Sequence, residues 1–372
     1  MLADDRHEES IFTTVMRTLH LDPPLLIGLI TLAAFGLVVL FSAGGEDADL
    51  MVRQAIRLGL AFFVMLMFAQ VSMPTLARWS PWIYAGGVIL LVLVLLMGEI
   101  GKGAQRWLDL GFFRFQPSEM MKLAVPMMVA WYFSDKPLPP RFRQLVTAGI
   151  LVAVPMLLIA KQPDLGTALL VGSAGFFAIY LAGISWRLLF GLGLAGVAAL
   201  PVLWHFMHDY QRQRVLTFLN PESDPLGSGY HIIQSKIAIG SGGFYGKGWL
   251  NGTQSQLEFL PERSTDFIFA VFGEEFGFLG ALTLLALYLS IILRGLYIAA
   301  NAQDTYSRLL AGSLSLTFFV YLFVNTGMVT GLLPVVGVPL PLVSYGGTSM
   351  VTLMAAFGML MSINSHRRLL SH

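Results

Sequence analysis

The sequence predicts an all-α polytopic membrane protein with about ten transmembrane helices. The chain has 372 residues, of which 56% are hydrophobic and only 12% are charged, and its mean hydropathy is +0.70. An ordinary soluble domain carries about 25% charged residues. The apolar residues also fall into runs of about 20, which is the length of a helix that crosses the hydrocarbon core of a bilayer.

Ten apolar runs justify the predicted number of spans. They lie at about 24–43, 54–72, 80–98, 117–134, 144–160, 165–183, 187–204, 266–293, 307–328 and 344–363. Short links join most of them, but the connections 99–116 and 205–265 are long. We therefore expect an N-terminal segment 1–23, a membrane domain 24–366 with a large extracytoplasmic loop 205–265 between spans seven and eight, and a tail 367–372.

The distribution of Lys and Arg sets the expected orientation. If both termini are cytoplasmic, the inside links hold 11 of the 23 basic residues. Counted over all links, the basic residues show no preference for the inside. Long loops are translocated largely regardless of their charge, so only the short links are informative. The basic link 135–143 and the tail "SHRRLLSH" then favour cytoplasmic termini. The loop 205–265 and the start of the eighth span are expected to face outward.

The first apolar run and the absence of cysteine exclude several kinds of segment and site. The apolar run after Pro24 is about 20 residues long, which is typical of a signal anchor and not of a shorter cleaved signal peptide. The chain has no Cys, so disulfides, thiol nucleophiles and Cys-ligated metals are excluded. The net charge of +1 gives no information about partners.

Polar residues gather at the predicted outer ends of the spans, and the first group lies in 102–124. Charges at membrane depth usually face a cavity or a partner. Glu119 and Lys122 are three residues apart and share a helix face, as an ordinary interfacial ion pair or as a functional pair. Trp107 is more typical of an interfacial anchor than of a ligand platform.

Three further polar positions each have a structural and a functional interpretation. Asp164, in the turn "KQPDLG", is favoured as an acid that begins the next helix. His231 has no metal-ligand spacing to another acid or His and is favoured as a structural histidine. The backbone of Ser344–Ser349 could hold an anion such as a phosphate, but a re-entrant turn that caps the last span is favoured.

The eighth span is too long for the bilayer. Residues 266–293 would make a helix of about 42 Å, at about 1.5 Å per residue, whereas the hydrocarbon core is about 30 Å thick. We expect the Asp266 end to project into a wet, outward-facing cavity. Glu274 and Glu275 point in different directions from Asp266 at about 100° per residue. They are therefore expected to cap or pair with neighbouring elements.

Several long segments resemble one family. The chain is similar to the SEDS family (shape, elongation, division and sporulation), and to its RodA branch more than to its FtsW branch. The matching segments are "KGAQRWLDLG…RFQPSE", "KQPDLGTALL", "GTQSQLEFLPERSTDFIFAVFGEEFG" and "PLPLVSYGGTSM". Ser264 stands where many members have His. The resemblance covers nearly the whole chain.

The resemblance implies a peptidoglycan glycosyltransferase that polymerises lipid II on the outer face of the bacterial inner membrane, for cell elongation and rod shape. In this family the Asp of the "TDF" motif is catalytic, which implies that Asp266 is the general base. A class B penicillin-binding protein, which crosslinks the strands, and other elongation-complex proteins are the implied partners, with no nucleic acid.

The implied donor substrate is a glycan strand on undecaprenyl pyrophosphate. The pyrophosphate leaving group needs no acid to protonate it. Its developing negative charge needs nearby cations or N–H donors. A divalent ion, Mg or Mn, could supply positive charge if carboxylates held it. The expected substrate-binding residues are Arg106, Trp107, Glu119, Lys122, Lys161, Asp164, Arg263 and Ser344.

Two other functions remain open at this point. A lipid II flippase would need a polar path through the bundle, whereas charges here gather at the outer ends. A non-catalytic scaffold of the elongation complex would leave Asp266 unexplained. Reconstituted protein supplied with outward-facing lipid II separates the three, because only a polymerase makes glycan.

Overall fold

A computed structural model describes residues 18–101, 104–109, 114–207, 209–223, 228–257, 259–260 and 262–365. The expected tail 367–372 and all but residues 18–23 of the expected N-terminal segment lie outside these residues. The long helices are α2 (Pro23–Ala43), α3 (Ala48–Ala69), α4 (Met73–Met97), α5 (Pro117–Ser134), α6 (Phe142–Lys161), α7 (Leu165–Leu181), α8 (Trp186–Phe206), α12 (Ile268–Ala300), α13 (Thr305–Val329) and α14 (Thr348–Ser365).

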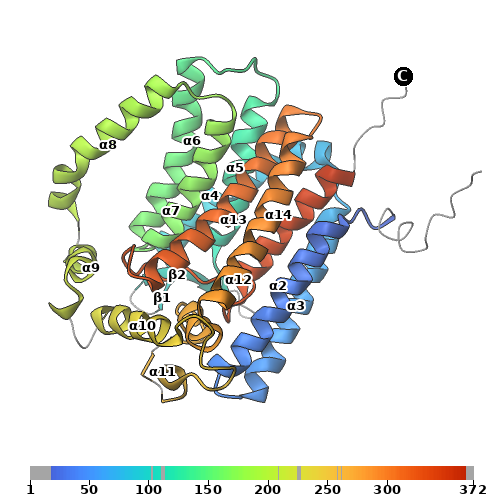
Figure 1. The fold of residues 1–372 in the computed structure, drawn as a ribbon. Helices are drawn as coiled ribbons and strands as arrows, with labels where there is room; N and C mark the ends of the chain where they lie inside the picture. The colour runs from blue at the N-terminus through green and yellow to red at the C-terminus, as the bar shows by residue number, and fades with distance from the viewer. Residues whose placement is uncertain are drawn as a thin grey trace, which may run out of the picture.

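Each predicted span overlaps one of these helices. Within the described residues, seven helices are long and apolar enough to cross a membrane, namely α2, α3, α4, α6, α12, α13 and α14. The helices α7 and α8 contain shorter apolar stretches. The helix α5 carries Glu119, Lys122 and an internal Pro126, which lower its hydropathy. The fold is therefore a helical bundle rich in membrane-length helices (Figure 1).

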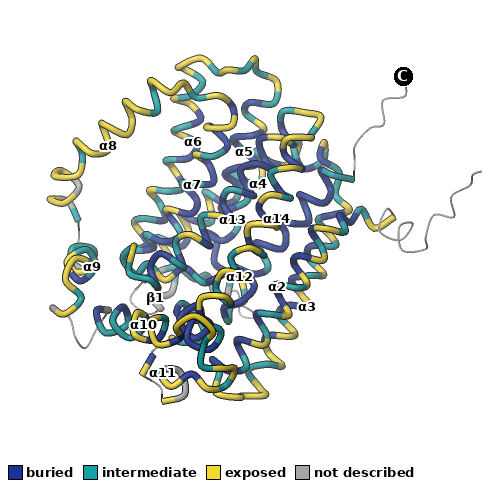
Figure 2. The backbone as a smooth tube through the Cα atoms, in the orientation of Figure 1, coloured by how far each residue is buried: buried dark blue, intermediate teal, exposed yellow. Residues whose placement is uncertain are grey.

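The core of the bundle lies along α5, α13 and α14. In α13 and α14 about two-thirds of the apolar window is buried, against 22% in α3, α4 and α6. Figure 2 shows the same contrast between the buried inner helices and the exposed α8. Large apolar side chains are exposed on the outer helices, among them Ile56, Phe63, Trp82, Leu157 and Phe190. Exposed apolar surface on this scale is typical of lipid contact.

The long connection before α12 folds into four short helices. They are α9 (Asp209–Leu219), the 3₁₀ helix η1 (Pro221–Ser223), α10 (Ser228–Gly242) and α11 (Thr253–Gln256). The helix α10 has the sequence SGYHIIQSKIAIGSG. It packs against α12, and α10 and α11 lie at one end of the bundle (Figure 1).

The other long connection contains strands that the all-α prediction missed. The strands β1 (Glu99–Gly101), β2 (Ala104–Asp109) and β3 (Arg114–Phe115) form an antiparallel sheet in the order β1-β2-β3. Ile100 pairs with Gln105, and Leu108 pairs with Phe115. The sequence Gly-Lys-Gly at 101–103 is a hairpin signal that the prediction did not use. The prediction overlooked it because the apolar runs dominated the analysis.

The eighth span is not one continuous helix of residues 266–293. Helix α12 begins at Ile268 and is interrupted at Gly277, whose φ of 66° and ψ of −161° are not helical. Glycine populates positive φ without steric cost. The long apolar run therefore forms two helical parts, and the second part begins at Phe278.

Backbone groups released by the break are satisfied by the loop 243–248. The Lys247 and Gly248 amides donate to the carbonyls of Glu274 and Glu275 at 3.0 and 2.9 Å. The Phe278 amide donates to the Gly243 carbonyl at 3.0 Å. The first part of α12 is therefore tied to the end of α10, and this junction fixes the segment that follows Asp266.

Candidate active site

Asp266 lies in a turn that leads into α12. It is half-buried, and the turn is closed by the Thr265 and Phe267 amides, which donate to the Glu262 carbonyl at 3.1 and 3.3 Å. Glu262 has a positive φ of 48°, so Glu262 and Asp266 are not one helical turn apart. A Cβ placed on Gly337 would lie 3.4 Å from Asp266 Oδ2. The loop before α14 therefore passes directly beside this carboxylate.

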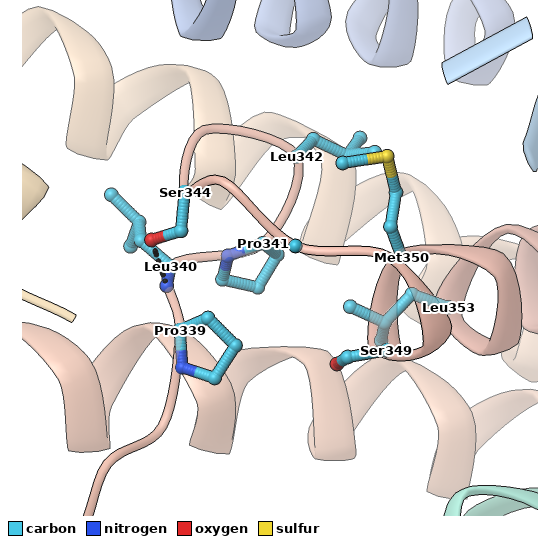
Figure 3. Close-up of a pocket in the computed structure, with 9 residues that line it drawn as sticks. Pro339, Leu340, Pro341, Leu342, Ser344, Ser349, Met350 and Leu353 are labelled. Atoms are coloured by element: carbon cyan, nitrogen blue, oxygen red, sulfur yellow. Dashed lines mark hydrogen bonds between the residues drawn. The ribbon is translucent and has the colours of Figure 1, made fainter. Parts of the chain in front are cut away.

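Ser344 joins that loop to the Asp266 turn. It is 2% exposed, its Oγ accepts from the Leu340 amide at 2.8 Å, and it donates to the Thr265 carbonyl at 2.5 Å. Figure 3 shows the contact with Leu340. The pocket enclosed by this loop has a volume of only about 10 Å³, roughly the space of one water molecule. The geometry agrees with the favoured re-entrant turn and leaves little space for a phosphate there.

Glu119 and Lys122 form an ion pair inside α5. Lys122 Nζ lies 2.7 Å from Glu119 Oε1, and the two residues are 5% and 7% exposed, respectively. The Lys122 ammonium also lies 5.2 Å from the centre of the Tyr321 ring. Glu119 Oε2 has no hydrogen-bond partner within the described parts of the chain. The pair is therefore buried within the protein and is not a solvent-exposed ion pair.

Arg106 and Asp164 form a second cluster between β2 and the start of α7. Arg106 Nε lies 3.5 Å from Asp164 Oδ2, and Arg106 Nη2 donates to the Pro163 carbonyl at 2.9 Å. Asp164 Oδ1 accepts from the Thr167 amide at 3.2 Å, which confirms its role as the N-cap of α7. Asp164 therefore serves the helix start and the arginine at the same time.

Gln116 connects the two clusters. Its Nε2 donates to Ser118 Oγ at 3.0 Å and to Asp164 Oδ2 at 3.4 Å. Gln116 and Glu119 also line a cavity of about 650 Å³ between α3, α5 and α14. Most of its lining is apolar, and Arg57 is its cationic side chain within the described residues. A large apolar cavity with a few polar groups is the usual form of a ligand site.

The remaining predicted residues are more peripheral. Trp107 is half-buried in β2, and Lys161 is exposed in the last turn of α6. Arg263 reaches the link between α2 and α3, where its Nη2 would lie 3.3 Å from a Cβ on Gly45. The structure thus pairs Glu119 with Lys122 and Arg106 with Asp164, and Gln116 donates to Asp164 from the start of α5.

Arg57 and Tyr345 were missed by the sequence analysis. The Arg57 guanidinium stacks on the Tyr345 ring at 4.4 Å, and the Tyr345 amide donates to the Ser264 carbonyl at 2.8 Å. This contact links the wall of the large cavity to the Asp266 turn. Arg57 lies inside a predicted span, where a charged residue is by default a candidate for function. That signal was present in the sequence and was not used.

Glu274 and Glu275 behave as the sequence analysis expected. Glu274 pairs with Lys247 at 2.7 Å and accepts from the Gln254 amide at 3.0 Å. Glu275 accepts a short hydrogen bond from Ser42. The His231 ring stacks on Phe267 at 5.5 Å, which agrees with the structural role favoured for it. These contacts anchor the segment around the Asp266 turn.

The described residues contain no group of three or more His, Cys, Asp or Glu placed to hold a metal ion. The carboxylates of the site are used in other ways, since Glu119 pairs with Lys122 and Asp164 pairs with Arg106. These two carboxylates are therefore not arranged as a ligand set for the divalent ion considered from the sequence.

Comparison with known proteins decides the family. A family model of cell cycle proteins, which covers FtsW, RodA and SpoVE, matches residues 23–369. The chain belongs to this family. The match spans the bundle, both clusters and the Asp266 turn, and it confirms the resemblance found in the sequence.

Individual relatives agree with this assignment. The Escherichia coli K12 peptidoglycan glycosyltransferase MrdB is 56% identical over 354 residues, which are 95% of each chain. The crystal structure of the rod shape determining protein RodA of Thermus thermophilus superposes with a TM-score of 0.71 at 29% identity, covering 93% of this chain and 97% of that one. A chain from a peptidoglycan synthase complex that coordinates polymerization and crosslinking superposes with a TM-score of 0.82 at 33% identity, covering 94% and 98%.

Proposed function

We propose that this chain is a peptidoglycan glycosyltransferase that polymerises lipid II, with Asp266 as the general base. The observation that carries the activity is the 56% identity, over 95% of both chains, to a peptidoglycan glycosyltransferase. The role of Asp266 is supported by its position in the family motif and by its half-buried carboxylate in a turn before α12.

The chemistry requires one base and no protonating acid. The 4-hydroxyl of the acceptor lipid II attacks the anomeric carbon of the donor glycan and forms the new glycosidic bond. The bond to the undecaprenyl pyrophosphate breaks, and the pyrophosphate leaves with the electron pair. Asp266 takes the proton of the attacking hydroxyl, which is general base catalysis. The two carboxylates of a glycosidase are not needed because pyrophosphate is already a good leaving group.

The negative charge of the leaving group needs fixed positive groups nearby. Lys122 belongs to the buried pair with Glu119, and Arg106 lies beside Asp164. Gln116 donates to Asp164 and lines the large cavity. Arg57 lines the same cavity, which makes it a further candidate. Arg263 and Lys161 lie at the edge of the site, where they would meet the substrate from outside. No step of this mechanism uses a metal ion.

The proposed arrangement in the membrane has ten spans, with both termini cytoplasmic and Asp266 on the outer face. It is supported by the ten long helices over the predicted runs and by the basic links. Trp107, in β2 beside the site, would act as an anchor at the outer membrane surface. This arrangement puts the base where lipid II, tethered by its isoprenoid, presents its sugars.

The proposed partner is a class B penicillin-binding protein. The similarity to a chain from a peptidoglycan synthase complex supports it. A polymerase without a crosslinker makes no wall, so a stable complex of the two enzymes in the bacterial inner membrane is expected.

The activity is tested with purified protein in liposomes that carry lipid II in the outer leaflet. A polymerase produces glycan chains under these conditions. A flippase moves lipid II between the leaflets without making glycan, and a scaffold does neither. Failure to form glycan by well-folded protein together with its partner would overturn the proposed activity.

A further inference from the structure

Asn325 holds two backbone segments at once. It lies in the last turns of α13 and is fully buried. Its Nδ2 donates to the Asp266 carbonyl at 2.9 Å and to the Val338 carbonyl at 2.8 Å. One side-chain amide has two N–H groups, so both of its donors are used to join the Asp266 turn to the loop before α14.

The two segments that Asn325 joins both lie next to the Asp266 carboxylate. One is the backbone of Asp266 itself. The other is the residue next to Gly337, whose missing Cβ would lie 3.4 Å from Asp266 Oδ2. Holding both carbonyls therefore limits movement of the Asp266 backbone relative to the loop that lies beside its carboxylate. A shift of either segment would move the carboxylate relative to its surroundings.

Stability alone gives a poor account of this side chain. Asn325 Oδ1 is buried and has no hydrogen-bond partner among the described residues. Removing a polar group from water without a partner destabilises the folded state. An amide that leaves its oxygen unsatisfied in order to place two donors suggests that the placement of those donors matters.

We infer that Asn325 is a positioning residue for Asp266, and this inference rests on the proposed role of Asp266 as the base. Ser344 and Tyr345 support the same turn, since they donate to the carbonyls of Thr265 and Ser264. These two donors reach the residues before Asp266, whereas Asn325 reaches Asp266 directly. Of these three residues, Asn325 is therefore the one that acts on the backbone of Asp266 itself.

The test compares the steady-state constants of Asn325→Ala and the wild type, per molecule of folded protein, in liposomes with lipid II. A displacement of about 1 Å at a reacting group can cost about 10²-fold in rate. We expect kcat to fall by a factor of this order, whereas KM for lipid II stays within about twofold because the binding surfaces are unchanged. A wild-type kcat in folded Asn325→Ala would overturn the inference.

A matched control comes from the same helix. Ser313 is fully buried in α13 and donates to the Ala174 carbonyl of α7 at 2.6 Å, but it does not touch the Asp266 turn. Ser313→Ala also removes a buried hydrogen bond between elements and is expected to keep the wild-type kcat. Equal losses in both variants would overturn the inference, because the effect would then be general packing of α13.

Two further variants keep the result interpretable. If Asn325→Ala does not fold, Asn325→Leu is measured against the same criterion, because Leu keeps the approximate size but has no donor. If Asn325→Leu also fails to fold, the structural role suffices and the inference is withdrawn. Asp266→Asn is measured beside it. An inactive Asp266→Asn with a fully active Asn325 variant overturns only the positioning role. A fully active Asp266→Asn overturns the general base, whatever Asn325 does.

Discussion

Lys122 and Glu119 meet at 2.7 Å within α5, and both side chains are almost completely buried. Two opposite charges in this setting are held together by their mutual attraction, whereas either one alone is costly. The pair lies next to the large cavity, because Glu119 is part of its wall. The contribution of the Glu119–Lys122 pair to stability and its contribution to activity can therefore be measured separately.

Lys122→Ala is expected to lower both stability and polymerisation. It leaves Glu119 buried without its cation, which typically costs about 3–5 kcal/mol. The double variant Lys122→Met with Glu119→Gln removes both charges and should recover most of the stability while remaining poorly active. Thermal unfolding and glycan formation are the measurements.

A control for this pair lies at the other end of the bundle. Arg294 donates to Asp22 at 2.6 Å, and Asp22 is also buried. Arg294→Met should destabilise to a similar extent, but its folded fraction should polymerise lipid II at the wild-type rate. Full activity of the Lys122/Glu119 double variant would remove the pair from the mechanism.

Asp164 has two roles that two substitutions can separate. Asp164→Ala removes the N-cap of α7 and should cost about 0.5–2 kcal/mol. Asp164→Asn can keep the cap but loses the charge that attracts Arg106. We expect Asp164→Asn to unfold near the wild-type temperature and to polymerise more slowly. Wild-type turnover by Asp164→Asn would mean that Asp164 serves only the helix start.

The break in α12 predicts a sensitive glycine. In Gly277→Ala the Cβ would lie 2.2 Å from the Gly246 amide nitrogen. The positive φ alone costs about 1–3 kcal/mol for a residue with a side chain, and the overlap adds to it. In contrast, a Cβ on Gly59 meets no atom within 4 Å, so Gly59→Ala in α3 should be neutral or slightly stabilising. Equal unfolding temperatures for the two variants would show that the break does not exist.

The partner prediction is tested by purification from membranes. A class B penicillin-binding protein should co-purify with the chain in mild detergent, and Asp266→Asn should retain it, since Asn has nearly the size and shape of Asp. Repeated absence of the partner, both in detergent and after crosslinking in cells, would count against a stable complex.

The sequence predicted the helices well because a span of about 20 apolar residues is a strong and local signal. It also predicted that Asp164 begins the next helix and that Glu274 and Glu275 are held by neighbouring elements. Both expectations follow from near neighbours in the sequence or from burial. It missed the break at Gly277, because the apolar run continues through it without interruption. The strands β1–β3 escaped notice for a similar reason, since they lie in a connection judged only by its length.

The candidate site was predictable only in part. Asp266 came from a family motif, whereas Asn325, Gln116 and Arg57 depend on contacts between segments that are distant in the chain. Asn325 lies 59 positions from Asp266, and no local pattern relates the two. Its only trace in the sequence is an amide near the end of an apolar span, which is a general hint of function.

Asp266→Asn is the variant on which the account depends. Asn keeps the size of the side chain but cannot accept the proton, and losing a positioned base typically costs about 10²–10⁴-fold in rate. Asp266→Glu should recover little activity, because an added methylene moves the carboxylate by about 1 Å. Glu262→Gln is the neighbouring control, since Glu262 closes the turn through its backbone carbonyl, and it should stay measurably active.

The most direct measurement is glycan formation from outward-facing lipid II by purified Asp266→Asn in liposomes, alongside the wild type and Glu262→Gln. The account predicts that Asp266→Asn inserts, folds and binds its partner, yet forms no detectable glycan chains, whereas Glu262→Gln forms them. Polymerisation by well-folded Asp266→Asn at a rate near that of the wild type would contradict the assignment of Asp266 as the general base.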